Sequence, residues 1–420
     1  MEIKVVSRLI IISNFLSLFV FPITNDVLDI NTWRLLCFSF LNIISLAYIF
    51  YNNELWELFY ECLRSKVAIL ISIFIGWGLL SSLYALNANE SILQSFTFIN
   101  FYLSLLILYT MISYNKFKAI TICAFIMLVV GAQMFFSYKA LYEITRYSPY
   151  TFAFNFNIIG IFPNRNITSA IYLIQLPFIL YVYVVTKMKI LKLAAGIQGF
   201  LLLYIVLLMG SRTAYVILFV VLIVFLGMFF INKNKEIRNF ITLYLALLTL
   251  SLLFSTISLG AKNDAYVVNR ISTIDFNETS TNTRLRYYKH GIKQFIFNPF
   301  IGVGLGNWKI VSVDHDKENI ISYIIPYTMH NDFLEVAAEL GSLGLLVYLL
   351  IYFFTLKHSW ELYNRVKTNP IIAIVPTCLL IWLVDSNLNF PFTRATELFY
   401  LAFIIALSLY FNNSRNEVNN

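Results

Sequence analysis

The chain has 420 residues, of which 59% are hydrophobic and only 12% are charged. A soluble domain carries about a quarter charged residues, so this chain lacks the charge needed to cover a surface that faces water. The net charge of +8 could suggest nucleic acid, but the basic residues are dispersed between apolar runs, so we expect no nucleic-acid partner.

Apolar runs of about 18 residues or more recur along the chain, each long enough to cross roughly 30 Å of hydrocarbon as a helix. These runs are continuous and do not alternate with a period of two residues, which favours helices over the strands of a barrel. We therefore predict an all-α, polytopic integral membrane protein with about twelve transmembrane helices. The expected spans are 9–24, 33–51, 67–86, 92–113, 117–137, 167–187, 192–209, 213–231, 238–260, 336–357, 370–387 and 395–411.

These spans divide the chain into a nine-helix membrane region (1–260), a large loop (261–335) and a three-helix membrane region (336–420). Arg8 and the apolar run after it are interpreted as the first span, because no cleavage pattern of a signal peptide follows them. The four cysteines form no CxxC pattern, so we expect neither a disulfide framework nor a metal site built on them.

The distribution of Lys and Arg predicts how the spans are oriented. If the N-terminus is cytoplasmic, the connections on that side hold roughly sixteen basic residues, whereas the short connections on the other side hold Arg34, Arg212 and Arg394. We expect both termini to be cytoplasmic and the large loop to lie on the outer side of the membrane.

Within the large loop, residues 283–297 combine apolar and basic positions at helical spacing, which predicts an amphipathic helix on the membrane surface. Asn298-Pro299 is expected to end this helix, and a glycine-rich turn, Gly302-Val-Gly304-Leu-Gly306, follows. The apolar positions are Leu285, Tyr288, Ile292 and Phe295, and the basic positions are Arg284, Arg286, Lys289 and Lys293.

Polar residues gather at the predicted outer face. Arginine binds phosphate oxygens with two parallel hydrogen bonds, and a histidine can accept a proton from an attacking hydroxyl, so this set of residues suits a phosphate-bearing substrate. The set consists of Asn164, Arg165, Asn166, Arg212, Arg284, Arg286, His330 and Asn331.

Each of these residues also has a structural interpretation. Arg212 could anchor a helix at the membrane interface, Arg284 and Arg286 could belong to a solvated helix face, and His330 could cap the helix after it. Asp314-His315-Asp316 lacks a second ligand group at helical spacing, so we do not expect it to bind a metal.

A transporter is the alternative from a different class. Coupled transporters place ionisable residues near the middle of the bilayer, whereas the exceptions here, Glu339 and Asp385, lie near the ends of spans. Polar residues that converge on the outer loop would favour an enzyme, and polar residues that line a path across the bilayer would favour a transporter.

Several motifs, taken in order, resemble those of the bacterial O-antigen ligases and related polymerases. His330-Asn331 is followed after nine residues by Gly341 and then by Gly344, as in the histidine motif of that family. The other matching segments are Gly210-Ser211-Arg212-Thr213, Arg284-Leu-Arg-Tyr-Tyr288, Asn298-Pro299-Phe-Ile-Gly302-Val-Gly304 and Phe162-Pro-Asn164-Arg-Asn166. Tyr288 stands where Trp is usual, and Arg165 interrupts the more usual Asn-Pro-Asn.

The resemblance implies a glycosyltransferase of the bacterial inner membrane whose active site faces the periplasm. It would transfer a glycan from undecaprenyl diphosphate to an acceptor such as the lipid A core, without a metal, another cofactor or a nucleotide sugar. By the same resemblance, Arg212 and Arg284 would bind the diphosphate, and His330 would orient or deprotonate the acceptor hydroxyl. Substrate-binding roles would fall to Arg286, Asn331, Asn164, Arg165, Asn166 and Tyr288.

The motifs leave open whether such an enzyme is a ligase, a polymerase or a protein glycosyltransferase. O-antigen polymerases often carry an arginine followed, eleven positions on, by glycine in two outer loops. No glycine stands at that distance after Arg146, Arg165, Arg270, Arg284 or Arg286, so the ligase is favoured.

Overall fold

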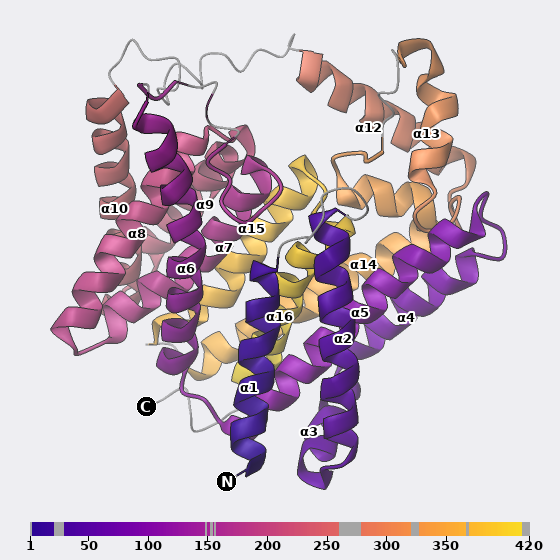
Figure 1. The fold of residues 1–420 in the computed structure, drawn as a ribbon. Helices are drawn as coiled ribbons and strands as arrows, with labels where there is room; N and C mark the ends of the chain where they lie inside the picture. The colour runs from indigo at the N-terminus through magenta and orange to yellow at the C-terminus, as the bar shows by residue number, and fades with distance from the viewer. Residues whose placement is uncertain are drawn as a thin grey trace.

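The computed structural model describes residues 2–20, 29–147, 149–151, 154, 157–259, 279–320, 327–366 and 369–413 (Figure 1). These residues form helices and no strand, which confirms the predicted all-α class. The α-helices are α1 Glu2–Leu16, α2 Ile30–Phe50, α3 Asn53–Leu63, α4 Lys66–Ser81, α5 Ala88–Asn115, α6 Ala119–Thr145, α7 Arg165–Val185, α8 Lys189–Met209, α9 Arg212–Ile231, α10 Lys235–Leu259, α12 Thr279–Phe297, α13 Trp308–Asp316, α14 Asp332–Arg365, α15 Ile374–Leu388 and α16 Ala395–Asn413.

The number of candidate membrane-spanning helices among the described residues is close to the predicted number of about twelve. Ten helices of the described residues are long and apolar enough to cross a membrane, or eleven if α3 and α4, which meet at 74°, form one bent span. A helix lies at or next to each predicted position, but α1 has 15 residues and α4 has 16. Both are shorter than the roughly 20 residues that cross the hydrocarbon core at full length.

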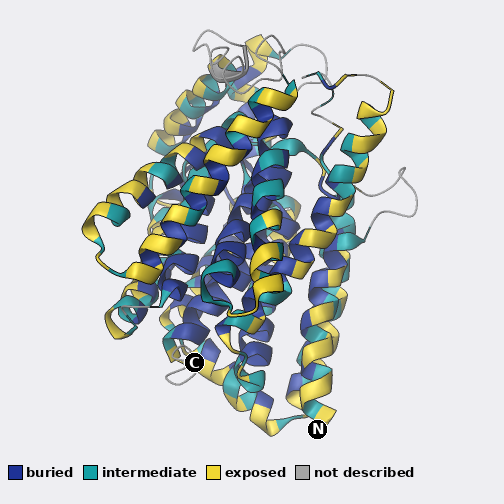
Figure 2. Cartoon of the chain, turned by 90° about the vertical axis from the view of Figure 1, so that its left-hand side faces the viewer, coloured by how far each residue is buried: buried dark blue, intermediate teal, exposed yellow. Residues whose placement is uncertain are grey.

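The helices form a bundle with two chemically different ends. The start of α1 and the end of α16 lie at one end, and α12 and α13 lie at the opposite end (Figure 1). We refer to the end that carries α12 and α13 as the loop end. Helices α7 and α16 are buried along nearly their whole lengths. Exposed residues lie along the outer helices (Figure 2), and many of them are apolar.

Helix α12 confirms the helix predicted over 283–297, but its buried face differs from its apolar stripe. Tyr287, Gly291 and Gln294 face the protein, where α12 packs on α13 and α14. Leu285 and Ile292 are instead 46% and 47% exposed. These two residues of the apolar stripe therefore point away from the bundle, whereas Tyr288 of the same stripe bonds to the carbonyl oxygen of His330. Contact of α12 with the membrane surface stays a prediction.

Candidate active site

His330 immediately precedes α14, but it does not cap that helix. The cap is Asn331, whose side-chain oxygen accepts a hydrogen bond from the backbone N–H of Leu334 at 3.0 Å. His330 itself has a φ of +58°, a left-handed conformation that is uncommon for residues other than glycine. The capping interpretation of His330 is therefore wrong, and its side chain is available for another role.

The surroundings of His330 hold its ring in place and favour its neutral form. Its carbonyl oxygen accepts a hydrogen bond from the hydroxyl of Tyr288 at 3.0 Å, and its ring meets the ring of Phe390 edge to face at 4.8 Å. Burial lowers the pKa of His330 to about 4, and the positive charges of Arg284 and Arg394 contribute to this change. A neutral imidazole can accept a proton.

Arg284 and Arg212 come together although they are 72 positions apart in the sequence. Burial lowers the pKa of the Arg284 guanidinium; the charge of Arg212 lowers it further, whereas Tyr288 and Asp385 oppose this effect. Within the described part of the chain, no carboxylate lies within ion-pair distance of Arg284. Two arginines whose charges act on each other, one of them partly buried, form a site that an anionic ligand would stabilise.

The segment before α7 supports the start of α9. Asn164 caps α7 by accepting hydrogen bonds from the backbone N–H groups of Asn166 and Ile167. Asn166 in turn accepts a hydrogen bond at 2.9 Å from the hydroxyl of Ser211, which caps α9 one residue before Arg212. The Asn-rich motif and the Ser-Arg motif are therefore parts of one junction.

The N-termini of several helices lie at the loop end and add to its positive potential. Helices α7, α9, α14 and α16 all start there, and the unpaired N–H groups of a first turn favour anions. Arg165 is the first residue of α7 and is partly buried at this junction. The substrate-binding roles of Asn164, Arg165 and Asn166 stay predictions.

Arg286 points to a different neighbour from Arg284. Its guanidinium forms an ion pair with Asp316 of α13, with nitrogen–oxygen distances of 2.7 and 3.1 Å. The side chain of His290 also approaches Asp316, at 3.4 Å. This geometry fixes α12 to α13, so it gives Arg286 a structural contact, and its predicted role in substrate binding stays untested.

Two glycines of the motifs meet in a close backbone contact. A Cβ at Gly341 would lie 2.3 Å from the carbonyl group of Phe300, and a Cβ at Gly302 would lie 2.3 Å from that of Glu339. Both glycines have φ near +70°, and Gly341 interrupts α14. The backbone N–H of Ser342 donates to the carbonyl of Pro299 at 2.7 Å. Glycine is required at both positions because any side chain would separate the turn from α14.

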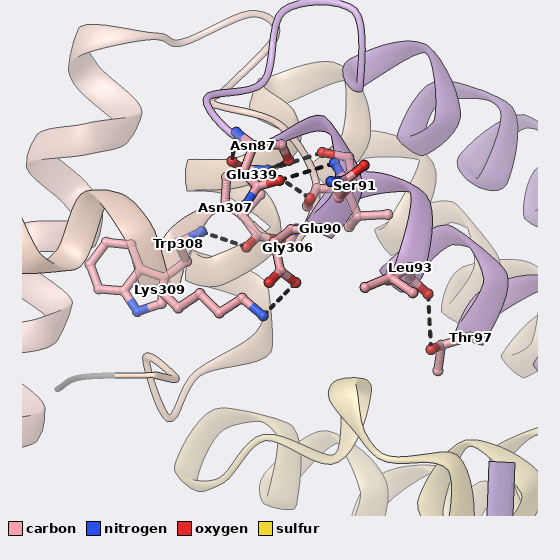
Figure 3. Close-up of polar contacts among 12 residues, drawn as sticks. Asn87, Glu90, Ser91, Leu93, Thr97, Gly306, Asn307, Trp308, Lys309 and Glu339 are labelled. Atoms are coloured by element: carbon pink, nitrogen blue, oxygen red, sulfur yellow. Dashed lines mark hydrogen bonds and ion pairs between the residues drawn. The ribbon is translucent and has the colours of Figure 1, made fainter. Parts of the chain in front are cut away.

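The carboxylate of Glu339 anchors the segment after this turn. It accepts hydrogen bonds from the backbone N–H groups of Gly306 and Trp308, both at 2.8 Å (Figure 3). On the other side, Asn307 bonds the start of α5 at Asn87 and Ser91. Glu335, one helical turn before Glu339, accepts a hydrogen bond from the N–H of Met329 at 2.8 Å. These contacts hold the chain next to His330 in position.

Buried charged side chains of the described residues concentrate at the loop end. Most of them sit at the first or last turns of helices, where they accept backbone hydrogen bonds or pair with each other, and they do not form a line through the bundle. They are Arg34, Asp316, Asp332, Glu335, Glu339, Asp385, Arg394 and Glu397. This distribution favours a site at one surface over a path for charged solutes.

Sequence reasoning missed the connection between α15 and α16 as part of this site. Asn387 in the last turn of α15 and Phe390 and Phe392 in the connection contact the His330 motif, and Arg394 influences the charge of His330. A signal was present, because Asp385, Asn387, Asn389 and Arg394 form a polar group from the end of one apolar span to the start of the next. Their distance from the motifs in the chain concealed the contact. In the described residues, no three His, Cys, Asp or Glu side chains gather as metal ligands would.

The fold and the site define a multi-pass α-helical membrane protein with a cationic, histidine-containing site at one end of the bundle. Residues 198–349 match the family model described as O-Antigen ligase, and this segment contains Arg212, Arg284 and His330. This match to part of the chain supports the resemblance to the O-antigen ligase family. No curated protein matches the chain.

Proposed function

We propose that the protein is an O-antigen ligase that transfers a glycan from undecaprenyl diphosphate to a hydroxyl of the lipid A core at the periplasmic face of the bacterial inner membrane. The proposal is supported by the contact of α12 with the His330 motif: Tyr288, one turn after Arg284, donates a hydrogen bond to the carbonyl oxygen of His330, and the charge of Arg284 acts on both His330 and Arg212. The donor is a diphosphate with a lipid tail, so a cationic site at the membrane boundary matches both parts of it.

The reaction follows from these roles. The acceptor hydroxyl oxygen attacks the anomeric carbon of the donor sugar, and the bond from that carbon to the diphosphate oxygen breaks. His330 takes the hydroxyl proton, and undecaprenyl diphosphate leaves with the bonding electron pair. Arg212 and Arg284 stabilise the charge that develops on this leaving group, which a divalent cation would otherwise do.

The test is a deletion of the gene, complemented in turn with the wild-type protein and with Arg212→Ala, Arg284→Ala and Arg146→Ala. Arg146 is the control because it is an exposed arginine at the end of α6. We expect the deletion strain and the first two variants to lose long polysaccharide bands on lipid A, while lipid-linked polymer accumulates. Arg146→Ala is expected to restore the bands.

Membrane levels of each variant are measured by immunoblot, so that loss of protein is not mistaken for loss of transfer. Surface bands with a single repeat unit in the deletion strain would identify a polymerase and contradict the proposed reaction. Normal long bands with either Arg212→Ala or Arg284→Ala would contradict the diphosphate site. Transfer in purified membranes is expected to persist in EDTA.

A further inference from the structure

The connection between α15 and α16 is attached to the His330 motif at several points. The hydroxyl of Tyr288 lies 3.0 Å from the carbonyl oxygen of His330 and 3.1 Å from that of Asn387. The side chain of Asn331 reaches Asn387 at 3.4 Å. The backbone N–H of Phe392 donates to Asp332 at 3.1 Å. The connection and the motif therefore form one unit.

Phe390 links His330 to a buried arginine. The ring centroid of Phe390 lies 4.8 Å from that of His330, with 84° between the ring planes. The guanidinium carbon of Arg394 lies 3.8 Å from the centroid of Phe390, within the range of a cation–π contact. Arg394 is 8% exposed and pairs with Glu397 at 3.3 Å.

The contacts among His330, Phe390 and Arg394 require a buried charge, which is energetically unfavourable, and this indicates that they have a role beyond packing. Removing a charged guanidinium from water is unfavourable until its partners offset the lost hydration, and an apolar side chain of similar volume would avoid that loss. His330 also adopts its left-handed backbone conformation within the same unit. Unfavourable conformations of this kind persist where the surroundings fix them, and they concentrate at functional sites.

We propose that Arg394 is a positioning residue for His330: it fixes the ring of Phe390, and Phe390 fixes the imidazole. This inference rests on the proposed function, in which His330 accepts the proton of the acceptor. The charge of Arg394 has a second effect, because a positive charge beside the imidazole opposes its protonation. Arg394 thus keeps His330 both oriented and neutral, without touching a substrate itself.

Other charged groups around His330 must be included in this argument. Arg284 opposes protonation in the same way as Arg394. Other titratable or charged groups on the neighbouring elements are Tyr288 on α12, Asp332 and Glu335 on α14, Asp385 on α15 and Glu397 on α16. Arg212 on α9 acts on Arg284. Arg394 can be distinguished from them because it alone contacts both Phe390 and Glu397.

The first experiment titrates His330 by NMR in the purified full-length protein, labelled with isotopes in histidine and held in lipid nanodiscs. The spectrum of His330→Gln identifies its signal among the four histidines. We expect Arg394→Gln to raise the pKa of His330 by on the order of one pH unit, and Arg394→Lys to remain closer to wild type. An unchanged titration in folded Arg394→Gln would overturn the proposal.

The second experiment compares two phenylalanines of the same connection. Phe390 touches His330, whereas Phe392 packs against Phe74, Phe98 and Tyr348 on the side of the bundle core. We expect Phe390→Leu to lower kcat at least about tenfold with an unchanged KM for the donor, and Phe392→Leu to keep the wild-type kcat. Equal kcat values for the two variants would contradict the positioning role.

The two experiments separate this inference from the proposed function. The NMR titration needs no catalysis, so it reports on Arg394 even if the wild-type protein transfers no glycan. A wild-type protein without transferase activity, but with the expected change in titration, would overturn the proposed function and leave the contact between Arg394 and His330 established. Transfer activity of the wild-type protein, together with an unchanged titration of His330 in Arg394→Gln, would support the proposed function and overturn the role of Arg394.

Discussion

His330 is a weak base in the free protein, because its pKa of about 4 reflects burial and two nearby arginines. Any ligand that brings negative charge to Arg284 opposes part of this effect. A bound diphosphate would therefore raise the pKa of His330 toward its ordinary value, and a stronger base would be present only when the donor is in place.

This difference predicts two separate pH profiles. Protonation removes the base, so activity is lost as the pH falls through the pKa of His330. The profile of kcat/KM for the donor reports the free protein, and we expect its acid limb near pH 4. The profile of kcat reports the donor complex, and its acid limb is expected at higher pH. Steady-state assays with purified protein from about pH 3.5 to about pH 8 would measure the acid limbs of both profiles, because this range covers the ordinary and the lowered pKa of a histidine.

Arg284→Gln is the informative comparison for these profiles. It removes one of the two charges that oppose protonation, so the acid limb of kcat/KM is expected to move to higher pH, in addition to a loss of donor binding. Acid limbs of kcat and kcat/KM that coincide in the wild-type protein would contradict the coupling between donor and base.

At the residue scale, the sequence predicted candidate site residues where a residue type suited to phosphate chemistry also belongs to a family motif. The residue types alone indicated a phosphate-binding site, and the family resemblance selected Arg212, Arg284 and His330 from it. Neither the residue types nor the family resemblance could show that Arg286 pairs with Asp316, because that contact depends on how α12 packs against α13. The role of Arg394 was hidden for the same reason, since it lies 64 positions after His330.

At the scale of elements, the close contact between Gly302 and Gly341 joins the turn after α12 to α14. Replacing Gly341 by Ala adds a Cβ 2.3 Å from the carbonyl of Phe300 and imposes a φ of +67° on a residue that disfavours it. The left-handed backbone alone costs on the order of 1–3 kcal/mol, and relief of the clash would move the turn that precedes the His330 motif. We expect Gly341→Ala to lower both thermal stability and transfer.

Gly227→Ala is the matched control for this substitution. Gly227 lies within α9, and a Cβ there would meet no atom within 4 Å. Alanine is favoured over glycine inside helices by up to about 1 kcal/mol, so Gly227→Ala is expected to keep stability and activity. Scanning fluorimetry in detergent and the transfer assay compare the two variants, and wild-type behaviour of Gly341→Ala would show that the turn can adapt.

Most helices could be predicted from the sequence because each apolar run is long and its ends are polar. Helices α3 and α13 were missed because they have 11 and 9 residues, too few for a run that crosses a membrane. The helix predicted in the loop was correct in extent. Which of its faces is buried could not be predicted, because Tyr287, Gly291 and Gln294 pack on helices from other parts of the chain.

At the scale of the whole molecule, the site lies at the end of the bundle opposite to the start of α1 and the end of α16 (Figure 1). The distribution of basic residues predicts that this end faces the periplasm. Single cysteines at Lys317 and Arg365, both exposed, would test this in a protein whose four native cysteines are replaced. We expect a membrane-impermeant reagent to label intact cells at position 317 and not at 365.

Permeabilised cells provide the control, since both positions are then expected to react. Labelling at position 365 but not at 317 in intact cells would reverse the orientation and place the site in the cytoplasm. That result would be incompatible with a donor and an acceptor that meet in the periplasm.

Arg34 has a consequence for how the protein is made. Its guanidinium is fully buried near the start of α2 and donates to Thr396 at the start of α16, 362 positions later in the chain. During synthesis α2 enters the bilayer long before that partner exists, and an unpaired arginine within a membrane helix is unfavourable. A second partner, the carbonyl oxygen of Ile161, is made earlier, so the pairing of Arg34 is completed in two steps. The full pairing of this early charge therefore depends on a helix made much later, and a chain that lacks α16 would leave the Arg34 guanidinium without its contact to Thr396.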